Sequence, residues 1–200
     1  MMRASVRACL FLLALVLTLA GCGKDSPQFK ASDVTGSGFG RDFALVDNTG
    51  KPRTLADFRG KVVVLFFGYT QCPDVCPTTL ATLAEAMQKL GPEAANVQVL
   101  FVTVDPERDN RELLTNYVTA FNPTFLGLSG DAEATARVAK EFKILYQKAP
   151  GATPDSYTVD HSAGTFVFDP QGRLRLYVGT GQGPEVFAHD IGELLRSAKS

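Results

Sequence analysis

Short apolar runs alternate along the chain with stretches in which apolar residues recur every three or four positions. Two continuous runs of strand length, "KVVVLFFGY" (residues 61–69) and "VQVLFVTVD" (97–105), are typical of strands buried on both faces of a sheet. The helical spacing of apolar residues predicts helices over residues 77–90, 110–121, 131–142 and 184–197.

Turn residues mark two hairpins. The stretch "DFALVDNTGKPRTL" (42–55) alternates around "DNTGK", and "AGTFVFDPQGRLRLYVG" (163–179) turns at Pro170-Gln171-Gly172. We further expect a short extended segment at 124–129, an edge-like strand at 143–148 and a loop at 149–160. Alternating strands and helices predict an α/β fold with a mixed, mostly parallel central sheet and helices on both faces.

The N-terminus has the features of an export signal. Arg3 and Arg7 precede the apolar stretch "CLFLLALVLTLA", and small residues follow it. Leu19-Ala20-Gly21-Cys22 resembles the bacterial lipobox, in which the cysteine is lipidated and becomes the mature N-terminus. We therefore predict a signal peptide over 1–21, a lipidated Cys22 with a flexible tether over 22–40, and one domain over 41–200. An uncleaved helical anchor, or a simple signal with a free Cys22, stays open.

Composition and charge narrow the class of protein. The chain has 200 residues, of which 45% are hydrophobic and 20% charged, which is the profile of one globular domain. The formal net charge is −1, and no basic tract is present. Nucleic acid is therefore excluded as an expected partner. The export signal places the domain on the extracytoplasmic side of a bacterial cell envelope, near a membrane.

Cys72 and Cys76 lie four residues apart in "GYTQCPDVCPTTL", directly after the first buried run. A disulfide over so short a loop removes little chain entropy, so a purely structural bridge explains them poorly. Pro77 favours the first position of a helix, which puts Cys76 at or near the N-cap. Helix amides and the helix dipole favour a thiolate there. Redox chemistry and soft-metal binding both use thiolates, so position alone does not separate the two.

The spacing of the two cysteines and the positions of the histidines favour metal binding over redox chemistry. Thioredoxin-type reductases use Cys-x-x-Cys, whereas the spacing here is Cys-x-x-x-Cys, which lets two sulfurs converge on one ion. His161 lies between a polar loop and a buried strand, at a strand end where ligands of open α/β sheets collect. His189 lies on the last predicted helix and is the weaker candidate. Two thiolates and an imidazole suit Cu(I) or Zn(II), or Cu(II) with a further weak ligand.

Four segments together resemble the Sco (SenC) family of copper-binding assembly factors for cytochrome c oxidase. They are "GYTQCPDVCPTTL" (68–80), "VTVDPERD" (102–109), "YTVDHSAGTFVFDPQGRL" (157–174) and "YVGTGQ" (177–182). The resemblance implies a thioredoxin-like fold and one copper, Cu(I) or Cu(II), held by Cys72, Cys76 and His161. It also implies a task at the binuclear copper site of oxidase subunit II.

Four functions compete for these residues. We predict a metallochaperone without turnover, with another periplasmic copper chaperone as a possible donor. A thiol-disulfide reductase that uses Cys72 and Cys76 on the oxidase cysteines, or a redox or copper signalling protein, is the alternative. A peroxidase is disfavoured. Glutathione-peroxidase-like enzymes rely on a tryptophan, and the chain has none. Peroxiredoxins place a threonine three residues before the cysteine, whereas Thr70 is two residues before Cys72. We expect Asp105 and Asp109 to organise a turn and cap the next helix.

Overall fold

The computed structural model describes residues 27–151 and 156–199. The predicted signal peptide and Cys22 lie outside these residues. Within the described ranges, no helix is both long and apolar enough to cross a bilayer.

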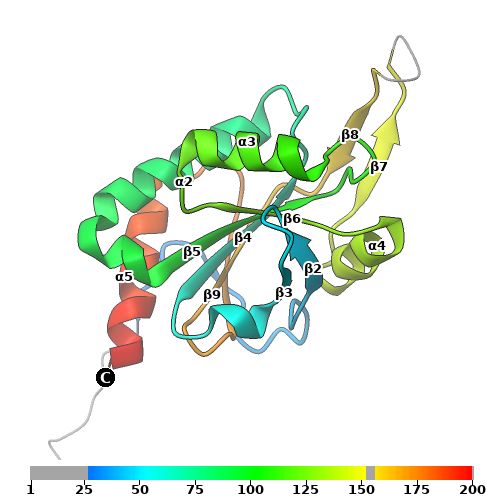
Figure 1. The fold of residues 1–200 in the computed structure, drawn as a ribbon. Helices are drawn as coiled ribbons and strands as arrows, with labels where there is room; N and C mark the ends of the chain where they lie inside the picture. Colours follow the sequence, from blue (N-terminus) through cyan, green and yellow to red (C-terminus); the bar gives the residue numbers. More distant parts are fainter. Residues whose placement is uncertain (1–26, 152–155, 200) are drawn as a thin grey trace, which may run out of the picture.

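An eight-stranded sheet forms the centre of the molecule (Figure 1), in the order β1-β10-β9-β4-β5-β6-β2-β3. Its strands are β1 (Ser32–Asp33), β2 (Ala44–Asp47), β3 (Pro52–Thr54), β4 (Val62–Gly68), β5 (Val97–Thr103), β6 (Leu126–Ser129), β9 (Thr165–Phe168) and β10 (Leu174–Val178). A separate two-stranded sheet pairs β7 (Tyr146–Ala149) with β8 (Thr158–His161). The second half of the predicted loop at 149–160 therefore contains a strand.

In the part of the chain that the structure describes, four α-helices and two 3₁₀ helices accompany the strands. They are α2 (Val75–Leu90), α3 (Arg111–Phe121), α4 (Ala132–Glu141) and α5 (Pro184–Lys199), with η1 (Leu55–Phe58) and η2 (Gly91–Asn96). All four predicted α-helices and both predicted hairpins are present, with ends that differ by up to about two residues, as is usual for helix boundaries.

The sheet is mixed, as predicted, but its parallel part is confined to the three central strands. β4 and β6 both run parallel to β5, whereas the other neighbouring pairs in this sheet are antiparallel. Short hairpin connections impose antiparallel pairing on β2–β3 and β9–β10, because a parallel pair needs a long crossover. Helices provide those crossovers only around β4, β5 and β6.

Strand β4 separates two apolar cores. Val62, Val64 and Phe66 pack in the core that contains residues of α2, α3 and α5. The alternate residues Val63 and Leu65, with Phe67, pack in the core that contains α4 and η1. This alternation follows from the two-residue period of a strand. Figure 1 shows α2 and α3 on one side of the sheet and α4 on the other, so the predicted three-layer arrangement is present.

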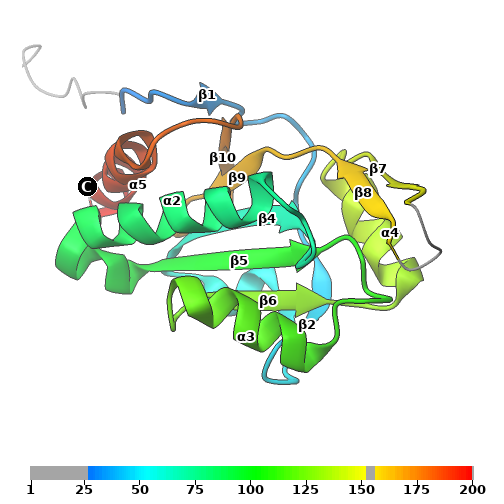
Figure 2. The ribbon, with the colours of Figure 1, turned by 90° about the horizontal axis from the view of Figure 1, so that it is seen from above.

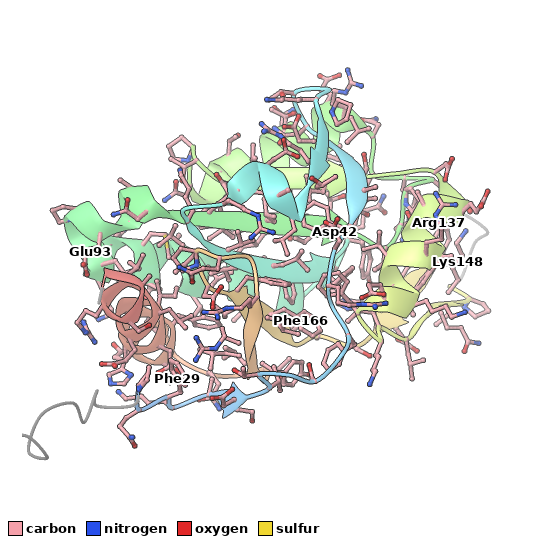
Figure 3. The ribbon with its side chains drawn as sticks, turned by 90° about the horizontal axis from the view of Figure 1, so that it is seen from below. Phe29, Asp42, Glu93, Arg137, Lys148 and Phe166 are labelled. Atoms are coloured by element: carbon pink, nitrogen blue, oxygen red, sulfur yellow. The ribbon has the colours of Figure 1, made fainter. Side chains whose placement is uncertain are left out.

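The N-terminal segment differs from the prediction of a tether over 22–40. In its described part, Ser32 pairs with Tyr177 as β1 adds to the edge of the sheet beside β10 (Figure 2). The backbone N–H groups of Lys30 and Ala31 donate to the Asp190 carboxylate, at 2.9 and 2.8 Å. Asp190 is buried on α5, and Phe29 lies beside that helix (Figure 3). Composition suggested a linker, but a buried carboxylate far along the chain binds this backbone.

Asp47 stabilises the hairpin of β2 and β3. Its carboxylate accepts hydrogen bonds from the backbone N–H and hydroxyl of Thr49, from the backbone N–H of Lys51, and from Arg53 Nε at 2.7 Å. Burial alone would raise the pKa of Asp47, but these hydrogen bonds outweigh burial and lower the pKa to about 2. The folded state therefore favours the ionised carboxylate.

We expect Asp47→Asn to lower the free energy of unfolding by up to about 2 kcal/mol at pH 7, the equivalent of the pKa shift. Because the folded pKa lies below the unfolded value of 3.8, this contribution is present above about pH 4. It is lost as the pH falls toward 2. Urea unfolding of both proteins between pH 7 and pH 3 measures the difference.

The exposed residue Glu112 on α3 offers a control, and Glu112→Gln should change stability by less than about 0.5 kcal/mol. A difference between Asp47→Asn and the parent that stays constant down to pH 3 would show that the charge is not its cause.

Candidate metal centre

The two cysteines lie at the carboxyl end of β4, where the chain turns into α2. The backbone N–H of Cys72 donates to the Tyr69 carbonyl at 3.2 Å, which closes the turn after the strand. The N-cap of α2 is Asp74, so Cys76 lies near the N-cap, as predicted, and inside the first turn. Pro77 fits there as well, because N–H groups throughout the first turn have no partner within the helix.

Cys76 is fully buried, whereas Cys72 is partly exposed. A Cβ atom at Gly68 would lie 2.7 Å from both Cys76 Sγ and a ring carbon of Phe101. Gly68 therefore leaves the space that the Cys76 sulfur occupies. Burial raises the pKa of Cys76, and the backbone at Tyr69 opposes this only partly. The helix start was expected to favour a thiolate, but burial outweighs it when no metal is bound.

His161 ends β8 and reaches the cysteines from the other side. The chain after it enters β9, whose first residue, Thr165, pairs with Phe66 of β4. The start of β9 therefore meets the end of β4, because the two strands are antiparallel. His161 Nε2 lies 3.6 Å from Cys76 Sγ.

Hydrogen bonding fixes the ring of His161 in the state that a metal ligand requires. Its Nδ1 lies 3.0 Å from the Ser162 carbonyl oxygen, which can only accept, so Nδ1 carries the proton. The lone pair of a neutral ring is then on Nε2, facing Cys76. Burial lowers the pKa of His161, which also favours the neutral ring. The rings of Phe66 and Tyr69 pack against the imidazole, with centroids 6.5 and 6.0 Å away.

The ligand atoms of Cys72, Cys76 and His161 all lie within 4.8 Å of one another, and both cysteines are free thiols. Metal–sulfur bonds of about 2.3 Å and metal–nitrogen bonds of about 2.0 Å separate two ligand atoms by about 3.5 to 3.7 Å. The observed 3.6 Å between Cys76 and His161 fits this spacing. Two sulfurs and one imidazole nitrogen form a soft ligand set for one ion.

The weaker candidate His189 and the two acidic residues nearest the site in sequence lie outside the cluster. His189 is on α5, with Nδ1 2.7 Å from Asp190 Oδ1, and takes no part in the cluster. Asp74 and Asp160 are exposed. Asp160 immediately precedes His161 in β8, so its side chain points to the opposite face of that strand.

Asp109 has a role that the sequence analysis missed. The helix α3 is capped by Asn110 rather than by Asp109. Asp109 is buried and accepts hydrogen bonds from the Thr103 hydroxyl and from the hydroxyl and backbone N–H of Thr70. Burial raises the pKa of Asp109, and these hydrogen bonds oppose that rise. Asp109 thus ties the turn that carries Cys72 to the end of β5, through a contact 39 residues apart that no local pattern signals.

Comparison with known proteins agrees with this architecture. Residues 32–196 match the family model described as SCO1/SenC. A copper-bound structure of ScoI from Bradyrhizobium japonicum has a TM-score of 0.73 and 38% identity, and the match covers 78% of this chain and 99% of that one. A SCO1/SenC family lipoprotein from Bacillus anthracis has a TM-score of 0.66 and 27% identity, covering 76% and 92%. These neighbours confirm the predicted thioredoxin-like fold.

Among curated proteins, the mitochondrial SCO2 homolog of Mus musculus is 39% identical over 152 residues. That match covers 75% of this chain and 60% of the relative, so the chain spans less than two thirds of the mouse protein's length. With the family model matched over most of the sequence, the chain belongs to the SCO1/SenC family.

Proposed function

We propose that this protein is a copper metallochaperone that binds one copper ion through Cys72, Cys76 and His161. One observation carries the proposal: the unprotonated Nε2 of His161 faces the buried Cys76 sulfur, and the Cys72 sulfur lies in the same cluster. Thiolates with an imidazole suit Cu(I) or Zn(II) by softness alone. The related ScoI protein solved with copper bound favours copper over zinc.

The burial of the three ligands suggests an order of exchange. Cys76 is fully buried, whereas Cys72 and His161 are both partly exposed. An incoming thiolate or imidazole of a partner reaches the ion first beside these two residues, and the bond to Cys76 breaks last. Copper binding displaces the protons of the thiols, and release of the ion returns them. Transfer by ligand exchange needs no turnover chemistry from the protein.

The proposed recipient is the binuclear copper site of cytochrome c oxidase subunit II, with another periplasmic copper chaperone as a possible donor. The resemblance of the sequence to the Sco (SenC) family of assembly factors for cytochrome c oxidase supports this recipient. We also propose that a lipid on Cys22 holds the domain at the extracytoplasmic face of a bacterial membrane. The export signal and lipobox of the sequence support the anchor, as does the family lipoprotein from Bacillus anthracis.

A thiol-disulfide reductase is the second candidate, because both cysteines are free and their sulfurs lie within 4.8 Å of each other. A small movement would bring them to bonding distance. The buried Cys76 is a poor nucleophile, since burial raises its pKa, so Cys72 would have to attack the target disulfide. A reductase has no need of the His161 ring beside the sulfurs, which favours the chaperone.

We expect the reduced protein without the predicted signal peptide to retain one copper per chain after anaerobic titration and desalting. Cys72→Ala and Cys76→Ala should each lower the Cu(I) affinity at least about a hundredfold, because each removes a ligand. His161→Ala should lower it by about ten- to a hundredfold. Competition with a chromophoric chelator measures the affinities, and His189→Ala is the matched control that should bind as the parent does.

Retention of copper by His161→Ala at the parental affinity would remove His161 from the site. If no variant or parent retains copper, and thiol-disulfide activity survives His161→Ala, the reductase would replace the chaperone as the function.

Gly68→Ala tests the space around the Cys76 sulfur. The new methyl group would lie 2.7 Å from Cys76 Sγ and from Phe101, so the sulfur must move. We expect a loss of about 1 to 3 kcal/mol in the free energy of unfolding and a lower copper affinity, measured by urea unfolding and by the same competition. Gly179→Ala is the control, because no atom lies within 4 Å of its new methyl group. Equal copper affinity in both variants would contradict the role assigned to Gly68.

A further inference from the structure

The loop between β5 and α3 contacts both segments that carry the cluster of Cys72, Cys76 and His161. Asp109 at its end holds the cysteine turn through Thr70. Asp105 and Arg108 hold the β7–β8 hairpin, through contacts that the proposed ligand set does not explain. The segment that bears the histidine and the segment that bears the cysteines therefore share one support.

Arg108 is the centre of these contacts. Its side chain is only 13% exposed, and its Nε donates to Asp105 Oδ2 at 2.5 Å. Nη1 donates to the Tyr157 carbonyl at 2.8 Å on the hairpin side and to Gln71 Oε1 at 3.3 Å beside Cys72. One planar guanidinium thus bridges the two ligand-bearing segments, a geometry that suits Arg and not Lys.

The ring of Tyr157 packs against the Arg108 guanidinium. The Arg108 guanidinium carbon lies 3.5 Å from the centre of the Tyr157 ring, and the Tyr157 hydroxyl donates to Asp105 Oδ1 at 2.8 Å. Asp105 is 1% exposed, so its carboxylate is a rigid acceptor for both partners. The chain runs directly from Tyr157 into β8, and His161 is the last residue of that strand.

A second path reaches His161 through Tyr69. The Arg108 guanidinium carbon lies 5.8 Å from the centre of the Tyr69 ring, and that ring packs edge-on against the His161 imidazole. Tyr69 is buried, with 2% of its surface exposed. Movement of Arg108 would therefore disturb the ring that packs on the histidine as well as the backbone that leads to it.

The β7–β8 hairpin contributes few apolar side chains to the core. It projects from the body of the molecule (Figure 1), and Val159 is the buried residue within its two described strands. An isolated two-stranded hairpin is marginally stable in water. The exposed ion pair of Lys148 with Glu107 contributes little. The Arg108–Tyr157–Asp105 contacts therefore join the burial of Val159 and the packing of Phe66 and Tyr69 on the imidazole in setting the position of His161.

We propose that Arg108 and Tyr157 are positioning residues that hold His161 within bonding distance of a copper ion on Cys72 and Cys76. This inference rests on the proposed copper site. Loss of either residue releases the hairpin, whereas Asp109 still holds the cysteine turn through Thr70. Copper then keeps its thiolate ligands and loses the imidazole. Residues that orient a metal ligand typically change affinity ten- to a hundredfold when they are removed.

A double-mutant cycle tests the proposal with Cu(I) as the probe. Arg108→Gln and Tyr157→Ala are each made in the parent and in the His161→Ala background. In the parent, each should lower Cu(I) affinity about tenfold. In the His161→Ala background, neither should lower it further, because the interaction they support is already gone. Tyr157 is partly exposed, so Tyr157→Ala still reports if Arg108→Gln fails to fold.

The control is Arg175→Gln. The Arg175 side chain is 16% exposed, pairs with Asp169 at 3.4 Å and lies 5.6 Å from the Phe29 ring, so it resembles Arg108 in its contacts. Arg175→Gln should leave Cu(I) affinity unchanged. Imidazole nitrogen NMR gives a second readout, since the chain has two histidines. The copper-induced shift of His161 should disappear in Arg108→Gln and persist in Arg175→Gln.

Three results would overturn the inference. Equal weakening by Arg108→Gln in both backgrounds would assign Arg108 to the fold and not to His161. Parental affinity in both Arg108→Gln and Tyr157→Ala, with His161→Ala still weakened, would overturn this inference and leave the proposed function standing. Parental affinity in His161→Ala itself would overturn the proposed ligand set, and this inference with it.

Discussion

Strand β4 pairs with parallel β5 on one side and with antiparallel β9 on the other, and this double pairing brings the residues of the candidate metal centre together. All seven residues of β4 are buried and paired with β5, so the strand cannot shift without exposing both apolar cores. Because β9 runs the opposite way, its start meets the end of β4. The cysteines follow β4 and His161 precedes β9, so residues 85 positions apart in the chain become neighbours.

The candidate site combines the buried Cys76 with the partly exposed Cys72 and His161, and this division has an electrostatic reason. A thiolate at Cys76 without a counter-charge is unfavourable, because burial raises its pKa. A bound cation supplies that charge and makes the buried thiolate favourable. The neutral state of His161 adds no charge of its own. The pocket is thus better matched to a thiolate with a cation beside it than to a free thiolate.

Much of the fold follows from local sequence patterns, and what does not follow depends on distant contacts. The buried runs at β4 and β5 and the turn at Pro170-Gln171-Gly172 were predicted correctly, since each pattern is local. The sequence also singled out the Cys-x-x-x-Cys turn and His161. It did not reveal that residues 27–40 attach to the domain, because that attachment depends on Asp190 more than 150 residues away. Asp109 was misread as a cap for the same reason, because Thr70 and Thr103 are its partners in space.

The attachment of the N-terminal segment determines how the domain carries a mechanical load. A pull on the chain at Phe29 acts first on the bonds from Lys30 and Ala31 to Asp190, and then on the short pairing of β1 with β10. β1 joins the sheet beyond β10 and β9, so two strands separate it from β4. Tension on the N-terminal segment is therefore borne by α5 and the edge of the sheet, and the turn that carries the cysteines stays relaxed.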